Sequence, residues 1–363
     1  MSHGLAASLA LMAVLLKPGR RSKMKDEFGL SDFGLVTYSV AGGAQSAGLA
    51  IDGRIIALSA LANTDPEGSP FLNGSVYDIV QHWDRAWPLI EKAAAVFRAS
   101  TALQSVSVAE DAVRLHAPIT SPRAIYCAGG NYRKHVIDIV SQRFVPKGQE
   151  HLSNEEVRAR AAAEVDARAR EGEPFFFNKN IPSLVGPYDD LFAPALATQM
   201  DWELELGVVI GRSAWCVSVE DALDHVAGYV VAHDVSTRDR MFRDGAVGAD
   251  FLQAKGLPTF FPLGPYLTPK AHVPDPQALR IVLKLNGEAK QDESTADMIF
   301  GVAKLISYLS KWVKINPGDI IATGSPAGNG TYYNRYLKPG DVIEGAITGL
   351  GTQRNRIVED VRP

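Results

Sequence analysis

The stretch 201–211, DWELELGVVIG, alternates acidic and apolar side chains before it becomes a continuous apolar run. On a strand, successive side chains point to opposite faces. One face therefore carries the three acidic residues Asp201, Glu203 and Glu205. Like charges on one face repel, and a hard divalent cation would stabilise them because Mg²⁺ and Ca²⁺ prefer carboxylate oxygens. The alternative is an acidic strand edge that water solvates.

The rest of the chain predicts many short strands and few helices. Its 363 residues include 32 Gly and 21 Pro, which favour tight turns. Strands are predicted near 124–128, 203–211, 227–233, 280–286, 318–323 and 341–348, and helices near 131–140, 219–224 and 297–310. Because no strand–helix–strand repeat occurs, we expect an α+β or mainly β fold with a mixed sheet rolled on itself.

The first third of the sequence predicts a small β-rich domain. Strand patterns at 35–40, 46–51 and 54–58 surround the hairpin dipeptide Asp52-Gly53, and helical patterns follow near 75–83 and 87–100. We predict a small N-terminal domain and linker over 24–120 and a larger domain over 121–363. Residues 1–23 read as a disordered tail, or as an upstream extension of a protein that starts at Met24. Their apolar run 5–16 is too short to cross a bilayer, which takes roughly 20 residues.

The segment 153–171 reads as a charged helix inserted in the larger domain. Ser153 and Glu156 form a capping box, and three charge pairs have the helical i,i+4 spacing: Glu156–Arg160, Glu164–Arg168 and Asp166–Arg170. With almost no large apolar residue, the helix should be solvated and packed weakly. It is either a lid over a neighbouring site or a surface insertion without a role.

Two further acidic positions stand beside predicted elements. Asp234 ends the apolar strand 228–233, where it could complete an oxygen-ligand site or cap a turn. His135 and Asp138 lie three residues apart on one predicted helical face, so the carboxylate could orient the imidazole as a general base. A pair of this kind is also common on protein surfaces.

The composition excludes several other classes of protein. The net charge of −4 supplies no basic field for nucleic acid, and two cysteines cannot build a disulfide framework or a cysteine zinc site. We expect a cytoplasmic protein with no nucleic-acid or membrane partner.

Several ordered segments together resemble the fumarylacetoacetate hydrolase family over about 124–355. The matching segments are Asn131-Tyr132 to His135, Phe175-Phe176-Phe177-Asn178-Lys179, the stretch 201–206, Gly228-Tyr229 to Asp234, Lys255, and 317–328. The resemblance implies the fold of that family's C-terminal catalytic domain, a homodimer, and a small dicarbonyl acid as substrate.

The resemblance also implies roles for individual residues. Glu203, Glu205 and Asp234 would hold Mg²⁺, or Mn²⁺ or Ca²⁺. The implied catalytic residues are His135 as the base for water, Asp138 as its partner, and Lys255 as the group that steadies negative charge. The implied substrate-binding residues are Arg238, Lys179 and Ser325.

Two departures from the family pattern bear on the reaction. Met241 stands where many members carry a glutamine of the oxyanion hole, and Gly256-Leu257-Pro258 replaces Ser-Phe-Asp after the lysine. Where one oxyanion donor matters, its loss costs about 10²–10³ in rate.

The expected reaction is hydrolysis of a carbon–carbon bond in a 2,4-dioxo acid of the acylpyruvate, fumarylacetoacetate or fumarylpyruvate type. It would use a metal-stabilised enolate and a water activated by His135. The departures keep an alternative open: isomerisation, decarboxylation or dehydration of a 2-keto acid at the same site. A non-catalytic metal-binding relative is the second alternative.

Overall fold

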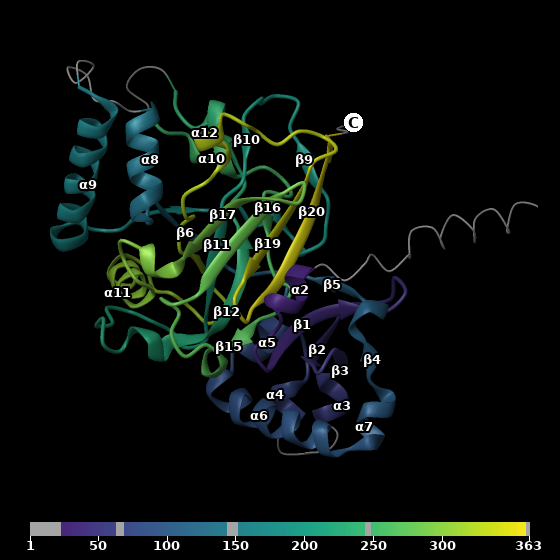
Figure 1. The fold of residues 1–363 in the computed structure, drawn as a ribbon. Coiled ribbons are helices and arrows are strands. Elements are labelled where there is room, and N and C mark those ends of the chain that lie inside the picture. Colours follow the sequence, from purple (N-terminus) through teal and green to yellow (C-terminus); the bar gives the residue numbers. More distant parts are fainter. Residues whose placement is uncertain (1–22, 63–68, 144–151, 244–247, 361–363) are drawn as a thin grey trace, which may run out of the picture.

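Three sheets form the framework of the protein (Figure 1). The structure is a computed structural model, and it describes residues 23–62, 69–143, 152–243 and 248–360. Almost all of the tail predicted at 1–23 lies outside these ranges. Within them, no helix combines the length and the apolar composition that crossing a bilayer requires.

The first sheet is antiparallel, with the strand order β4-β3-β2-β1-β5. The predicted Asp52-Gly53 hairpin joins β2 to β3, and both turn residues have positive φ, as the tight hairpin turn requires. The elements of this part of the chain are α2 (Lys23–Glu27), β1 (Phe33–Ser39), β2 (Ser46–Ile51), β3 (Arg54–Ala57), α3 (Leu58–Ala62), α4 (Ser69–Leu72), α5 (Val76–Val80), α6 (Trp83–Ala99), α7 (Thr101–Val106), β4 (Val108–Ala109) and β5 (Arg114–His116).

The second sheet is mixed and carries the acidic stretch in its interior. Its order is β15-β12-β11-β18-β6-β7; β18 and β6 run parallel, and the other pairs are antiparallel. Its strands are β6 (Ile125–Gly129), β7 (Phe175–Asn178), β11 (Leu204–Ile210), β12 (Val226–His233), β15 (Thr268–Pro269) and β18 (Ile320–Ala322).

The third sheet covers the second and has the order β17-β16-β19-β20-β9. Its strands are β9 (Leu191–Ala193), β16 (Arg280–Leu285), β17 (Glu288–Ser294), β19 (Val342–Ile347) and β20 (Gly351–Glu359). The remaining elements are α8 (Arg133–Arg143), α9 (Asn154–Glu171), β8 (Leu184–Val185), β10 (Met200–Asp201), β13 (Ser236–Thr237), α10 (Phe251–Lys255), β14 (Phe261–Pro262), α11 (Val302–Trp312) and α12 (Gly330–Tyr333).

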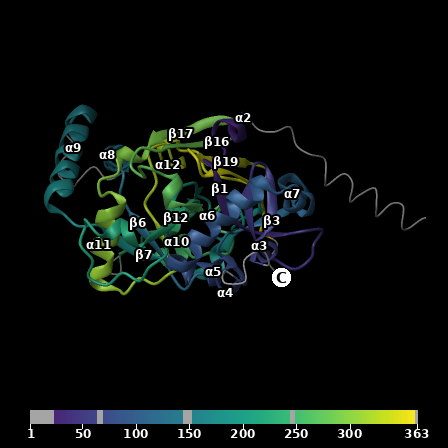
Figure 2. The same cartoon turned by 90° about the horizontal axis from the view of Figure 1, so that it is seen from below.

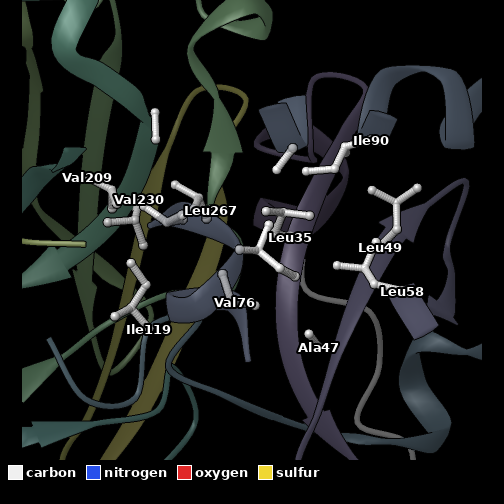
Figure 3. Packing of buried hydrophobic residues seen from close by; sticks show 14 of the residues in the cluster. Leu35, Ala47, Leu49, Leu58, Val76, Ile90, Ile119, Val209, Val230 and Leu267 are labelled. Atoms are coloured by element: carbon white, nitrogen blue, oxygen red, sulfur yellow. The ribbon is translucent and has the colours of Figure 1, made fainter. Parts of the chain in front are cut away.

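Strand β11 is buried along its whole length because apolar layers cover both of its faces. Leu204 and Leu206 pack in one core cluster with Leu283 of β16, whereas Val209 belongs to a second cluster. This second cluster continues into the N-terminal sheet, where Leu35 packs (Figure 3). The backbone N–H groups of Leu35 and Leu267 donate to each other's carbonyls at 2.9 Å, which ties β1 to the catalytic part.

The register of β11 against β12 positions the acidic residues. Leu204 is opposite His233, and the N–H of Asp234 donates to the carbonyl of Glu203 at 2.9 Å. Asp234 therefore lies beside the start of β11 rather than at a distant turn.

The predicted fold class is confirmed, and most predicted elements occur within a few residues of their predicted ends. The helix predicted at 219–224 is wrong, because this segment is a turn followed by a short 3₁₀ helix, Ala222–His225. The helix predicted at 297–310 begins only at Val302. Just before this helix, Asn131 accepts hydrogen bonds from the N–H groups of Ile299 at 2.7 Å and Phe300 at 2.9 Å. These bonds hold the segment in a non-helical turn.

The inserted helix α9 packs more firmly than its sequence predicts. Figures 1 and 2 show α8 and α9 side by side, standing out from the sheets. Val157, Ala161 and Val165 of α9 are buried, and the latter two pack with Ile137 of α8. The polar contacts also differ from those expected. Asp166 pairs with Arg133 of α8, at 2.7 and 3.0 Å, and not with Arg170.

Leu206→Ala should lower the free energy of unfolding by about 2–5 kcal/mol, because it opens a cavity between the second and third sheets. Urea unfolding measures this loss. Leu196→Ala is the matched control, since Leu196 is 68% exposed and its truncation should change the free energy by less than about 0.5 kcal/mol. Equal losses from both variants would contradict the assigned core.

Candidate metal centre and active-site cavity

A cavity of about 490 Å³ opens where β11 begins and β6 ends. It brings together residues from β6, α8, α9, β7, β11, α10 and the loops after β12 and β18. Its polar lining includes His135, Glu203, Glu205, Asp234, Arg238, Lys255, Ser325 and Thr331, and its apolar lining includes Ile139, Phe175, Phe177, Met241 and Phe251.

The three predicted metal ligands lie together in this cavity. Glu203, Glu205 and Asp234 are buried and offer one oxygen each within 4.8 Å of one another. Glu205 comes from β11, whereas Glu203 and Asp234 lie at adjacent ends of β11 and β12. Three buried carboxylates form a hard oxygen donor set, which suits Mg²⁺, Mn²⁺ or Ca²⁺.

Three cationic side chains compensate part of this negative charge. Lys255 Nζ donates to Glu203 Oε2 at 2.5 Å and also to Asp234 Oδ2. Lys179 Nζ donates to Asp234 Oδ1 at 2.6 Å and to the carbonyl of Val235 at 2.9 Å. Arg238 donates to Glu203 Oε1 and, from Nε, to Asp201 Oδ2 at 2.8 Å.

These contacts perturb the ionisation of the cluster. Burial opposes charge on Glu203, but Arg238 and Lys255 lower the pKa of that carboxyl below its usual range. Burial also opposes charge on Lys255, but Asp234 and Glu203 raise the pKa of its ammonium. For Lys179, burial dominates and lowers the pKa.

Glu205 is the carboxylate that the protein's own cations compensate least. The described residues offer it the N–H of Gly324 at 2.7 Å and no hydrogen-bonded cation. Burial and the neighbouring Asp234 and Glu203 raise its pKa well above the usual range. A divalent cation would relieve this repulsion, so the residues present fit a metal.

Asp201 has a structural role and is not one of the three clustered ligands. Its carboxylate accepts from the N–H groups of Gly330 at 2.5 Å and Thr331 at 3.2 Å, and from Arg238. It therefore fixes Arg238 and the start of α12 beside the cavity.

His135 and Asp138 are both buried on α8, but they are not hydrogen-bonded to each other. Asp138 Oδ1 pairs with Arg158 Nη2 of α9 at 2.8 Å. His135 lines the cavity, and burial lowers the pKa of its imidazole to about 4. The imidazole is therefore neutral at pH 7, without the carboxylate partner that the sequence predicts.

Ser325 also lines the cavity, and a buried amide holds it in place. Gln291 of β17 donates to Ser325 Oγ at 3.0 Å and to the carbonyl of Pro326 at 2.8 Å. Asn131 supports the same loop by donating to the carbonyl of Thr323 at 2.8 Å.

Gln291 and Arg158 contact site residues although their sequence context indicates no such role. No strand is predicted around Gln291, and Arg158 lies in a charge pattern that suggests contacts within one helix. Arg168 was expected to pair with Glu164, but its Nη1 donates to the carbonyl of Gly130 at 2.6 Å.

Known proteins resemble most of this chain. The family model described as the fumarylacetoacetate hydrolase C-terminal domain matches residues 124–358. The chain is 36% identical over 270 residues to the mitochondrial oxaloacetate tautomerase FAHD2A of Bos taurus, covering 74% of this chain and 77% of that protein. It is 45% identical over 190 residues to the 2,4-didehydro-3-deoxy-L-rhamnonate hydrolase of Sphingomonas sp. (strain SKA58), covering 52% and 66%.

A solved structure has the same fold along most of the chain. It is the maleylpyruvate hydrolase of Sphingobium sp. SYK-6 in complex with manganese(II) ion and pyruvate, with a TM-score of 0.63 and 25% identity. The similarity covers 90% of this chain and 99% of that one.

Glu205→Gln should weaken Mn²⁺ binding by at least about 100-fold, because it removes one of three clustered carboxylates. Mutating residues that only orient a metal ligand already lowers metal affinity by about 10–100-fold. Titration calorimetry on EDTA-treated protein measures the affinity. Glu173→Gln is the matched control, since Glu173 lines the same cavity outside the cluster. Mn²⁺ affinity that survives Glu205→Gln would show that the ion binds elsewhere.

Proposed function

Because the chain belongs to the fumarylacetoacetate hydrolase family, we propose that it interconverts the keto and enol forms of a 2-oxo acid in a metal-dependent reaction. The observation that carries the proposal is the pairing of Asp138 with Arg158. A histidine that activates water is usually held by a hydrogen-bonded partner such as a carboxylate. Within the described residues no carboxylate is hydrogen-bonded to His135, and proton transfer at carbon does not require one.

The protonation state of His135 allows proton transfer to and from carbon. Burial lowers the pKa of its imidazole to about 4, so at pH 7 the ring is neutral and can accept a proton. Bound Mg²⁺ or Mn²⁺ would polarise the 2-oxo group and so acidify the C–H beside it. His135 would then move a proton between this carbon and the oxo oxygen, which is the whole reaction of a tautomerase.

The charge of the site supports an anionic substrate. The site gathers four carboxylates (Asp201, Glu203, Glu205 and Asp234) and three cationic side chains (Lys179, Arg238 and Lys255). With a divalent cation bound and all four carboxylates ionised around it, the site would carry one net positive charge, which attracts the carboxylate of an oxo acid. Lys255 and Arg238 would hold the metal-binding carboxylates in place, and Ser325 would offer its hydroxyl to the substrate.

Hydrolysis of a carbon–carbon bond in a 2,4-dioxo acid is the second candidate. The similarity to a hydrolase and the position of His135 in the cavity favour it. Met241 lines the cavity where the family pattern suggests an amide donor, so an oxyanion formed there would have one donor fewer. The two reactions share the metal and the oxo acid, and they differ in whether water enters.

Three expectations from the sequence stay predictions: the choice of Mg²⁺ as the physiological ion, the homodimer, and the cytoplasmic location. The name of the tautomerase relative places that protein in mitochondria.

His135→Ala should lower the rate of enol-to-keto conversion by about 10²–10⁴, the usual contribution of a positioned acid or base, while Mn²⁺ affinity persists. The decay of enol-oxaloacetate absorbance, measured above the rate of a metal-only blank, tests this. His225→Ala is the control, because His225 lies outside the cavity and its ring contacts the backbone of Arg212.

Asp138→Asn separates the two candidate reactions. If Asp138 binds Arg158 and does not orient His135, Asp138→Asn should lower the rate of enol-to-keto conversion far less than His135→Ala does. An equal loss in both variants, with pyruvate and a carboxylic acid released from acylpyruvates, would overturn tautomerisation in favour of hydrolysis.

A further inference from the structure

The outer wall of the cavity is aromatic. Phe175 and Phe177 lie on the same face of β7, as the two-residue period of a strand requires, and Phe251 begins α10 opposite them. The rings of Phe177 and Phe251 stack with centroids 4.8 Å apart and an interplanar angle of 10°. Phe175 stands 5.7 Å from Phe251 and is 49% exposed, so it marks the solvent end of the wall.

The wall is continuous with the metal centre. Lys255 Nζ, which holds Glu203 and Asp234, lies 4.9 Å from the centroid of the Phe177 ring. An oxo acid bound at the carboxylate cluster would therefore direct its remaining atoms along the three rings. Gly129 of β6 lets the Phe175 ring take its place in the wall, because a Cβ at this position would come within 2.7 Å of that ring.

The cavity is larger than the volume that a short oxo acid would fill. About 490 Å³ falls within the roughly 300–1,000 Å³ of pockets that enclose drug-sized ligands. A four-carbon acid at the cluster would leave the space beside the rings to water. An exposed phenylalanine on such a wall gains stability when a flat apolar group covers it.

The charged groups at the outer end do not form a carboxylate site. Arg168 donates to the carbonyl of Gly130 and lies 5.3 Å from the centroid of Phe300. Glu173 lines the same rim, and its negative charge would oppose a second carboxylate there. The cavity therefore has one further cation and one further anion outside the cluster, and the three rings form an apolar surface beside them.

We propose that Phe175, Phe177 and Phe251 form a subsite for a flat apolar substituent on the 2-oxo acid. The preferred substrate class is then an aryl or otherwise unsaturated 2-oxo acid, which should bind more tightly than a short acid that ends in a second carboxylate, such as oxaloacetate. This inference rests on the proposed function, since it takes the carboxylate cluster as the site of the oxo acid.

Three stable mimics of an oxo acid test the subsite by binding alone. The full chain, treated with EDTA and reloaded with Mn²⁺, is titrated calorimetrically with oxamate, N-phenyloxamate and N-oxalylglycine. N-phenyloxamate should bind about tenfold or more tightly than oxamate, because its ring is buried against the wall. N-oxalylglycine, which carries a distal carboxylate, should bind more weakly than N-phenyloxamate.

Variants test whether the three rings cause the tighter binding of N-phenyloxamate. The ratio of the N-phenyloxamate and oxamate affinities should fall to about threefold or less in Phe251→Ala, and to an intermediate value in Phe251→Leu, which keeps apolar volume without a flat ring. Each ratio comes from one protein sample, so a partly unfolded variant does not distort it. Phe192→Ala, on β9 and outside the cavity, should keep the wild-type ratio.

The outcomes separate the subsite from the reaction. Any of four results overturns the subsite. They are an affinity ratio near one in the unmodified protein, binding of N-oxalylglycine tighter than that of N-phenyloxamate, an unchanged ratio in Phe251→Ala, and no binding of any mimic. The predicted ratios without any keto–enol conversion would support the subsite and contradict the proposed reaction.

Discussion

The burial of four carboxylates at adjacent ends of β11 and β12 is the constraint on which the rest of the structure depends. A buried charge is costly unless it is paired and hydrogen-bonded. Asp201, Glu203 and Asp234 meet this requirement through Arg238, Lys179 and Lys255. Glu205 meets it only through one backbone N–H. A bound cation would offset the remaining free-energy cost of burying this charge.

The sheets make this arrangement rigid. The antiparallel register of β11 and β12 places Glu203 beside Asp234, and apolar layers on both faces of β11 resist any shift of that register. The loop after β18 supplies the N–H for Glu205 and the hydroxyl of Ser325, with Gln291 and Asn131 holding its backbone. Strand pairing and the hydrogen-bonded loop after β18 therefore hold the carboxylates in place.

Local sequence patterns predicted the framework because their physical basis is local. The alternation in 201–211 identified the acidic face, and the Asp52-Gly53 turn identified its hairpin. The position of Asp234 at a strand end left open a metal ligand and a turn cap, and the family resemblance indicated the ligand. Spacing could not decide this, because Asp234 meets Glu203 only through strand pairing. Charged side chains with a choice of partners were less predictable. Asp138 has the right spacing to reach His135, but Arg158 from another helix binds it. Asp166 likewise binds Arg133 across the two helices, and the i,i+4 rule could not reveal that competitor.

The most direct test of the central claim is proton exchange at C3 of 2-oxobutanoate in D₂O with Mg²⁺, followed by proton NMR. Our account predicts that the protein accelerates loss of the C3 proton signal above the Mg²⁺ blank without forming a new compound. It also predicts that Glu205→Gln abolishes the acceleration. Exchange no faster than the blank, or exchange that survives Glu205→Gln, would contradict the claim that this buried carboxylate site promotes proton transfer at the carbon beside an oxo group.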